Sequence, residues 1–181
     1  MITEDLELLK YPIGKFVAPE NITRHDMNVW LNNIRQLPLL LEIAVQDLDE
    51  SQLLTPYRPG GWNVTQVVHH VADSHMNAYT RFKLALTEDN PVIKPYEEQL
   101  WAELPDVTST PINVSNTLLH ALHKRWTKLM DGLTDEQWER TFTHPASGKV
   151  SRLKEVLGMY SWHGHHHRMH IMRLKEREGW D

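Results

Sequence analysis

The chain of 181 residues contains no cysteine. Disulfide bonds, thiolate metal sites and a cysteine nucleophile are therefore excluded, so that a metal ion would have to be held by histidine, carboxylate and water. Long apolar runs are also missing, because the longest, Leu37 to Val45, contains Pro38 and Glu42 and is too short to span a bilayer. The net charge of −5 comes without a basic cluster, so neither nucleic acid nor a membrane surface is an expected partner.

The first seven residues are acidic and lack the apolar segment of a secretory signal, which predicts a cytoplasmic protein. The length and the 40% hydrophobic content are typical of one globular domain with a substantial core, which we place at residues 1–181. Residues 1–20 contain Pro12, Gly14 and Pro19 and are expected to form an irregular N-terminal arm.

Four segments have the apolar spacing of helices, and no segment of useful length alternates as a strand does. The predicted helices cover residues 23–48, where Pro38 should cause a kink, then 62–86, 113–130 and 151–178. In the third of them the residues expected to face inward are Leu118, Leu119, Leu122, Trp126 and Leu129. The pattern predicts an all-α four-helix bundle.

The connection between the second and third helices, residues 87–111, is long and contains four prolines. We expect one short helix in it, near 97–103, and a crossover in the topology. Connections of this length in compact domains are often functional or pack over another feature. Further along, a short helical piece is expected at 135–140, and a small hairpin or loop at 142–150.

Five histidines lie between positions 163 and 170. Neutral imidazole is the commonest metal ligand in proteins, and residues four apart share a helix face, so His163 with His167, or His166 with His170, could bind one ion. On a wheel of roughly 100° per residue His167 lies near the middle of the apolar face and His163 at its edge. His170 lies just outside that face, His166 lies further out, and His165 points away. The wheel favours His163 and His167, and the alternative is a solvated tract or hydrogen-bonded core histidines.

A third ligand could come from the second helix, which carries His69, His70 and His75. His75 falls on the main apolar face, whereas His70 lies roughly 120° from the centre of that face. Geometry alone therefore favours His75 as the buried residue and leaves the third ligand open.

Six stretches of the chain resemble the DinB/YfiT-like metalloenzyme family, and above all its YfiT-like branch. They are Tyr11-Pro-Ile-Gly14, Thr55-Pro-Tyr-Arg-Pro-Gly-Gly-Trp62, Val67-Val-His-His-Val-Ala-Asp-Ser-His-Met-Asn77, Arg81-Phe-Lys-Leu84, Leu119-His-Ala-Leu-His-Lys-Arg-Trp126 and Trp162-His-Gly-His-His-His167. The resemblance implies a DinB-type bundle with a three-histidine metal site made of His70, His163 and His167. Gly164 stands where relatives often have serine.

The resemblance also implies one divalent transition metal per chain, with zinc or nickel favoured, and a homodimer. Three imidazoles with an open position are the ligand set of a catalytic zinc site, and cobalt and copper(II) also suit nitrogen ligands. Two activities are implied on a small-molecule substrate: transfer of a low-molecular-weight thiol, such as bacillithiol or mycothiol, onto an electrophile, and metal-dependent hydrolysis. Because Gly164 occupies the glutamate position of H-E-x-x-H and no other general base stands out, thiol transfer is favoured. The alternative of a different class is a non-catalytic metal-binding stress protein.

Three further residues are candidates for the surroundings of this site. Asp73, three residues after His70, could orient a ligand or water, although an ordinary surface aspartate is the simpler interpretation. His75 and Tyr160 could line the pocket or pack in the core. Four other polar residues are expected on solvated helix faces rather than against an anionic substrate: Arg81, His120, His123 and Arg125.

Overall fold

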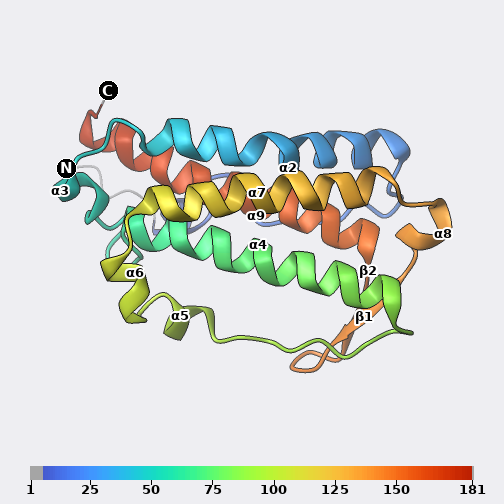
Figure 1. Ribbon diagram of the computed structural model, residues 1–181. Coiled ribbons are helices and arrows are strands. Elements are labelled where there is room, and N and C mark those ends of the chain that lie inside the picture. The colour runs from blue at the N-terminus through green and yellow to red at the C-terminus, as the bar shows by residue number, and fades with distance from the viewer. Residues whose placement is uncertain (1–5, 181) are drawn as a thin grey trace.

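The computed structural model describes residues 6–180, and four long helices dominate it (Figure 1). They are α2 (Arg24–Val45), α4 (Val64–Thr87), α7 (Ile112–Asp131) and α9 (Leu153–Glu178). The predicted all-α four-helix bundle is confirmed, with boundaries within three residues of those expected. None of the helices between residues 6 and 180 combines the length and the apolar composition that crossing a membrane requires.

The shorter elements lie in the connections. They are α1 (Leu6–Lys10), α3 (Glu50–Leu53), α5 (Glu98–Trp101), α6 (Pro105–Ser109), α8 (Asp135–Trp138), β1 (Thr141–His144) and β2 (Lys149–Arg152). The two strands form an antiparallel hairpin, one of the two forms expected for 142–150. The arm is not wholly irregular, since α1 occupies part of it, and the long connection holds two short helices where we expected one; residues 1–5 of the arm lie outside the described part.

Polar side chains fix where two of the long helices begin. Thr23 accepts a hydrogen bond from the backbone N–H of Asp26, whose carboxylate accepts one from the Thr23 backbone. Asn63 and Gln66 form the same reciprocal pair at the start of α4. These capping boxes satisfy backbone donors that have no partner within the helix.

Each long helix has two neighbours in the bundle. Both α2 and α4 pack against α7 and α9, so α2 and α4 lie diagonally although they are successive long helices in the chain. The long connection then carries the chain from the end of α4 back to the start of α7 (Figure 1). This arrangement places α4 beside α9, the two helices that carry the candidate metal ligands.

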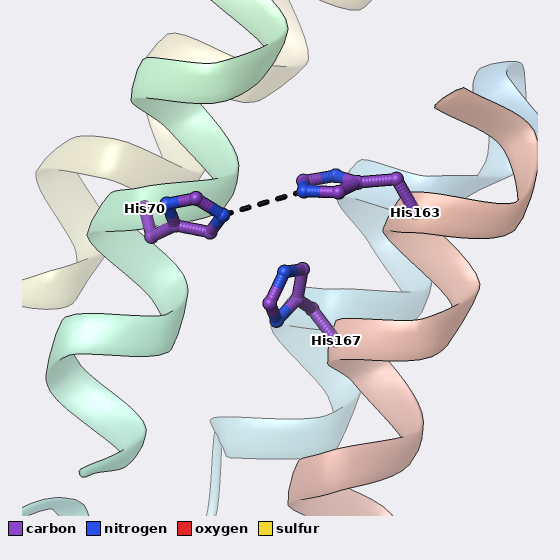
Figure 2. A group of neighbouring side chains, drawn as sticks. All are labelled: His70, His163 and His167. Atoms are coloured by element: carbon purple, nitrogen blue, oxygen red, sulfur yellow. Dashed lines mark hydrogen bonds between the residues drawn. The ribbon is translucent and has the colours of Figure 1, made fainter. Parts of the chain in front are cut away.

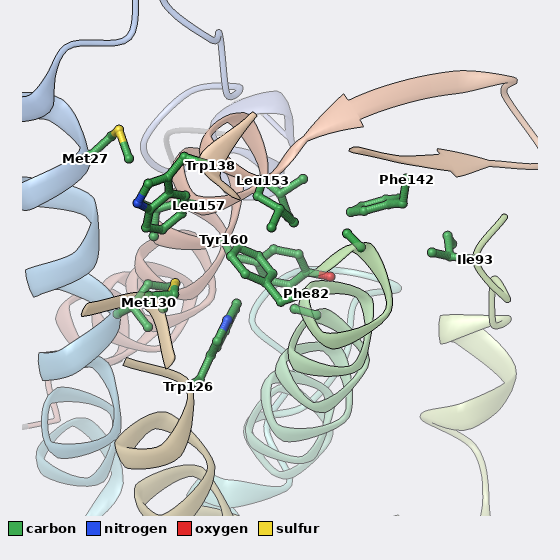
Figure 3. Packing of buried hydrophobic residues seen from close by; sticks show 14 residues of the cluster. Met27, Phe82, Ile93, Trp126, Met130, Trp138, Phe142, Leu153, Leu157 and Tyr160 are labelled. Carbon is green, nitrogen blue, oxygen red and sulfur yellow. The ribbon is translucent and has the colours of Figure 1, made fainter. Parts of the chain in front are cut away.

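The apolar core is divided into two clusters along the bundle. The cluster near the hairpin includes Phe82, Trp126 and Leu157 (Figure 3), and the other includes Val68 and Ile171. Along α4, α7 and α9 the residues between the two clusters include buried histidines. A polar layer therefore crosses the middle of the bundle.

Most residues expected inside α7 are buried, but Leu118 is 42% exposed, and its predicted inward position is wrong. Leu119 takes the core position instead and is completely buried. Successive side chains on a helix point about 100° apart, so only one of two adjacent leucines can face the centre of the core.

Gly164 of α9 lets α2 approach closely. A Cβ atom built on Gly164 would lie 2.2 Å from Cδ2 of Leu37, so a larger side chain must displace Leu37. We expect Gly164→Val to lower the free energy of unfolding by about 1–3 kcal/mol through overpacking, as measured by urea denaturation. Ala121→Val, at an exposed position of α7, is the control and should change stability much less. An unchanged unfolding midpoint in Gly164→Val would contradict this packing account.

Candidate metal centre

Three imidazoles from two adjacent helices converge on one point (Figure 2). His70 projects from α4, and His163 and His167 project from α9 one turn apart. Each offers a ring nitrogen within 4.8 Å of those of the other two. The Nε2 atoms of His70 and His163 are 3.3 Å apart. The structure thus brings together the three histidines that the family resemblance implied as ligands.

The spacing of these nitrogens suits a small divalent ion. Nitrogen ligands lie about 2.0–2.1 Å from zinc, so two of them at a tetrahedral angle are about 3.3 Å apart. The Nε2–Nε2 distance between His70 and His163 in the structure is 3.3 Å. The donor set therefore fits a divalent transition metal.

Burial keeps these imidazoles in the neutral form that binds metals. It lowers the pKa of His70 to about 4, and it holds the pKa values of His163 and His167 well below the ordinary value. Repulsion from neighbouring histidines acts in the same direction. Protons therefore compete with a metal ion less than they would at exposed histidines.

A second group of nitrogen donors lies beside the first. His166, His167 and His170 also offer nitrogens within 4.8 Å of one another. His170 donates a hydrogen bond through Nε2 to the carbonyl of Lys10, 3.0 Å away, and His166 stacks on Trp162. Because His167 belongs to both groups and offers one lone pair when neutral, one ion would select one group.

The wheel placed His166 and His170 outside the apolar face of α9, but both are buried. The N-terminal arm covers them: Lys10 accepts the hydrogen bond from His170, and the ring of Tyr11 lies 5.9 Å from that of His166. A wheel describes one helix and could not show that another segment would pack on this face. His165, expected to point away, is exposed.

The three histidines line a cleft of about 310 Å³. Other walls come from the arm, from the loop before α4 and from α5, and they include Lys10, Tyr57, Arg58, Trp62 and Glu98. The ring of Trp62 lies 4.5 Å from that of His70. The long connection between α4 and α7 contributes to the cleft through α5. This agrees with the expectation that a connection of this length is functional or packs over another feature.

The sequence did not single out four of these lining residues: Lys10, Tyr57, Arg58 and Glu98. Tyr57 and Arg58 lie within the stretch Thr55–Trp62 that carries part of the family resemblance, so that motif was the available signal. Lys10 and Glu98 had no such signal, because their position depends on how α1 and α5 fold back over the bundle.

Asp73 and Tyr160 do not line this cleft. Burial raises the pKa of Asp73 to about 6, and the nearby carboxylate of Asp106 contributes. The buried hydroxyl of Tyr160 accepts a hydrogen bond from Arg81, 3.2 Å away, and burial raises its pKa. A supporting role for either residue in the metal site stays a prediction.

His75 is completely buried, as the wheel indicated, and it contacts the metal centre through His163. The expectation that His123 lies on a solvated face is wrong, because it is 2% exposed and pairs with His75. His120, on the same helix, is exposed as expected and pairs with Glu42.

Relatives of the chain are similar over almost their whole length. Proteins of Bacillus cereus (strain 03BB102) and Bacillus anthracis (strain A0248), each named "Putative metal-dependent hydrolase", are both 53% identical over 172 residues, or 95% of this chain and 98% of the relative. Among solved structures, YfiT from Bacillus subtilis, described as "a probable metal-dependent hydrolase with an unusual four-helix bundle topology", is 48% identical with a TM-score of 0.94. That match covers 96% of this chain and 99% of YfiT.

A more distant structure shows the same fold. The mycothiol-dependent maleylpyruvate isomerase is 17% identical with a TM-score of 0.65, over 83% of this chain and 63% of the isomerase. The family model of the DinB superfamily matches residues 34–171, a range that includes the three converging histidines. The chain therefore belongs to the DinB superfamily.

Proposed function

We propose that this protein is a metal-dependent enzyme in which His70, His163 and His167 hold one divalent transition metal, zinc or nickel. We further propose that it transfers a low-molecular-weight thiol onto an electrophile. The observation that carries the proposal is a group of three neutral imidazoles that opens onto a cleft of about 310 Å³. A cleft of this size is at the lower end of the range for small-molecule sites.

The charges around the cleft favour a substrate that reacts as an anion. When bound, the metal supplies a positive charge that lowers the pKa of a water or thiol in contact with it. A free thiol has a pKa of about 8.5 and water about 15.7, so a thiol needs far less help to ionise. Three neutral histidines leave the charge of the ion uncompensated, and on the walls the two cations Lys10 and Arg58 outnumber the single carboxylate of Glu98.

Aromatic side chains complete the site. Trp62 packs beside His70, and Tyr57 stacks on His170 with ring centroids 3.9 Å apart. These rings exclude water from one side of the three histidines, which strengthens electrostatic interactions inside the cleft. Arg58 donates a hydrogen bond to the carbonyl of Pro59, 3.0 Å away, which holds its cation at the wall.

Hydrolysis is the second candidate, and Glu98 is the observation that favours it. This carboxylate lines the cleft and could accept a proton from water. The names of the Bacillus relatives also support hydrolysis. A purely structural ion that ties α4 to α9 is the third candidate, although such a site would normally be closed by four protein ligands.

A cobalt-substituted sample separates the candidates. For thiol transfer we expect a sulfur-to-cobalt charge-transfer band when cysteine, glutathione or bacillithiol is added, and product formation with an electrophile above the uncatalysed rate. Glu98→Gln should leave that rate nearly unchanged, whereas it should lower an esterase or amidase rate by about 100-fold if Glu98 is a general base. A cobalt spectrum that ignores all three thiols would rule out thiol transfer. If ester and amide cleavage were also absent, the structural role would remain.

A further inference from the structure

A row of hydrogen bonds crosses the polar layer of the bundle and ends at the metal centre. His123 Nδ1 of α7 lies 2.6 Å from the backbone carbonyl oxygen of Ile34 in α2. His123 Nε2 lies 2.9 Å from His75 Nδ1 of α4. His75 Nε2 lies 3.3 Å from His163 Nδ1 of α9. Each of the four long helices therefore contributes one group to the row.

Pro38 explains why a carbonyl in the middle of α2 is available to His123. In an α-helix the carbonyl of residue 34 accepts from the N–H of residue 38, and proline has no N–H. Pro38 lies inside α2, so the Ile34 carbonyl has no helical donor at that position. A buried carbonyl without a donor is costly, and the ring of His123 supplies one. The proline expected only to kink the helix thus also exposes an acceptor.

The carbonyl sets the direction of every bond in the row, because it can only accept. His123 must carry its proton on Nδ1 to donate to Ile34, which leaves His123 Nε2 as an acceptor. His75 must then donate from Nδ1, which leaves its Nε2 as an acceptor for the Nδ1 proton of His163. Neutral imidazole has one proton, so the Nε2 atom of His163 carries a lone pair and no proton.

We propose that His123 and His75 are positioning residues that hold His163 in the Nδ1–H tautomer, with the lone pair of Nε2 directed into the metal centre. Figure 2 shows that nitrogen beside Nε2 of His70, at the 3.3 Å distance given above. Metal-binding histidines generally donate their other N–H to a protein acceptor, which fixes the ring and increases its basicity. Here the acceptor for His163 is the imidazole of His75, which in turn donates to His123, and the final acceptor is the Ile34 carbonyl. His75 and His123 are 0% and 2% exposed. This inference rests on the proposed metal site.

The first test reads the tautomers in metal-free protein by long-range ¹H–¹⁵N NMR of histidine labelled with ¹⁵N. We expect neutral rings with the proton on Nδ1 for His123, His75 and His163. We also expect ¹⁵N–¹⁵N couplings through the two imidazole–imidazole hydrogen bonds. A proton on Nε2 of His163 would overturn the proposal. The experiment needs neither bound metal nor turnover, so its outcome is independent of whether the proposed function is correct.

The second test removes the connection without touching the proposed ligands. His123→Phe fills a similar volume but offers no acceptor to His75, so we expect the zinc dissociation constant to rise about 10- to 100-fold. His123→Gln keeps an acceptor oxygen and should restore much of the affinity together with the Nδ1–H tautomer of His163. The matched control, His120→Phe on the exposed face of α7, should leave both unchanged.

The variants also separate positioning from simple stability. If His123→Phe folds, as judged by circular dichroism, and keeps both the wild-type zinc affinity and the wild-type His163 tautomer, the proposal is wrong. If that variant does not fold, the tautomers of wild-type protein and of His123→Gln still decide the question. If zinc affinity is lost in His123→Phe and recovered in His123→Gln, the row of hydrogen bonds is supported as the cause of the difference in affinity.

Discussion

Replacing any one of His70, His163 and His167 by alanine should weaken metal binding by more than about 100-fold, because direct ligands matter at least as much as the groups behind them. Two imidazoles would remain, and they cannot complete the set of three protein ligands typical of catalytic sites. The measurement is metal content after dialysis, followed by competition with a chromophoric chelator. Purified wild-type protein should hold one equivalent, and each of the three variants should hold almost none.

Two controls on α9 make this result specific. His165 is exposed and points away, so His165→Ala should keep one equivalent of metal. His166→Ala tests the neighbouring group of donors and should also keep it. Retention of tightly held metal by His70→Ala would show that the ligand assignment is wrong. Loss of metal in His166→Ala would then identify His166, His167 and His170 as the site.

Metal-free protein should lose stability steeply as the pH falls below about 6.5, the ordinary pKa of histidine. Burial lowers the pKa values of eight histidines in the bundle interior, of which His163 is half-buried and the other seven are buried: His69, His70, His75, His123, His163, His166, His167 and His170. The folded state then binds fewer protons than the unfolded state, so the stability present above pH 6.5 is lost progressively as the pH falls towards the folded-state pKa values. For His70, His123 and His170 those values are about 4.

The expected size of this effect is large. Each histidine that is protonated only in the unfolded state contributes about 1.4 kcal/mol per pH unit. Three of them would remove about 4 kcal/mol per unit, from a typical total of about 5–15 kcal/mol. Urea unfolding of chelator-treated protein between pH 7.5 and 4.5 should show this slope. His123→Gln should reduce the slope by about 1.4 kcal/mol per pH unit, because one histidine fewer takes up a proton on unfolding. Constant stability over this range would contradict the described burial of the histidines.

The fold could be predicted from local signals because the helices satisfy local rules. Apolar spacing located all four long helices, and two of these helices begin at local capping signals, Thr23 and Asn63. The errors occurred where tertiary packing decides. The helix α6 begins at Pro105 within a stretch without clear periodicity. The arm packs against α9, where Trp162 donates a hydrogen bond to the carbonyl of Gly14. The single domain over 1–181, the homodimer and the cytoplasmic location stay predictions.

The candidate site was only partly accessible from the sequence. The spacing of His163 and His167 indicated a pair on one helix face, but the wheel favoured His75 over His70, and only the family resemblance pointed to His70. The physical reason is that α4 packs against both α7 and α9. The centre of the apolar face of α4, where His75 lies, is directed between α7 and α9. His70 lies beside that centre, on the side of α4 that is directed towards the cleft. His75 was correctly expected to be buried, but its link to His163 depends on α7 and on Pro38 in α2.

The most direct test of the central claim is a crystal structure of zinc- or nickel-loaded protein with anomalous data collected at the metal edge. We predict one strong anomalous peak per chain, about 2.0–2.1 Å from nitrogen atoms of His70, His163 and His167, with at least one further position open to the cleft. In the metal-loaded crystal structure, His163 should bind the metal through Nε2 and donate a hydrogen bond from Nδ1 to His75. A peak held by His166 and His170, or no peak near His70, would contradict the account.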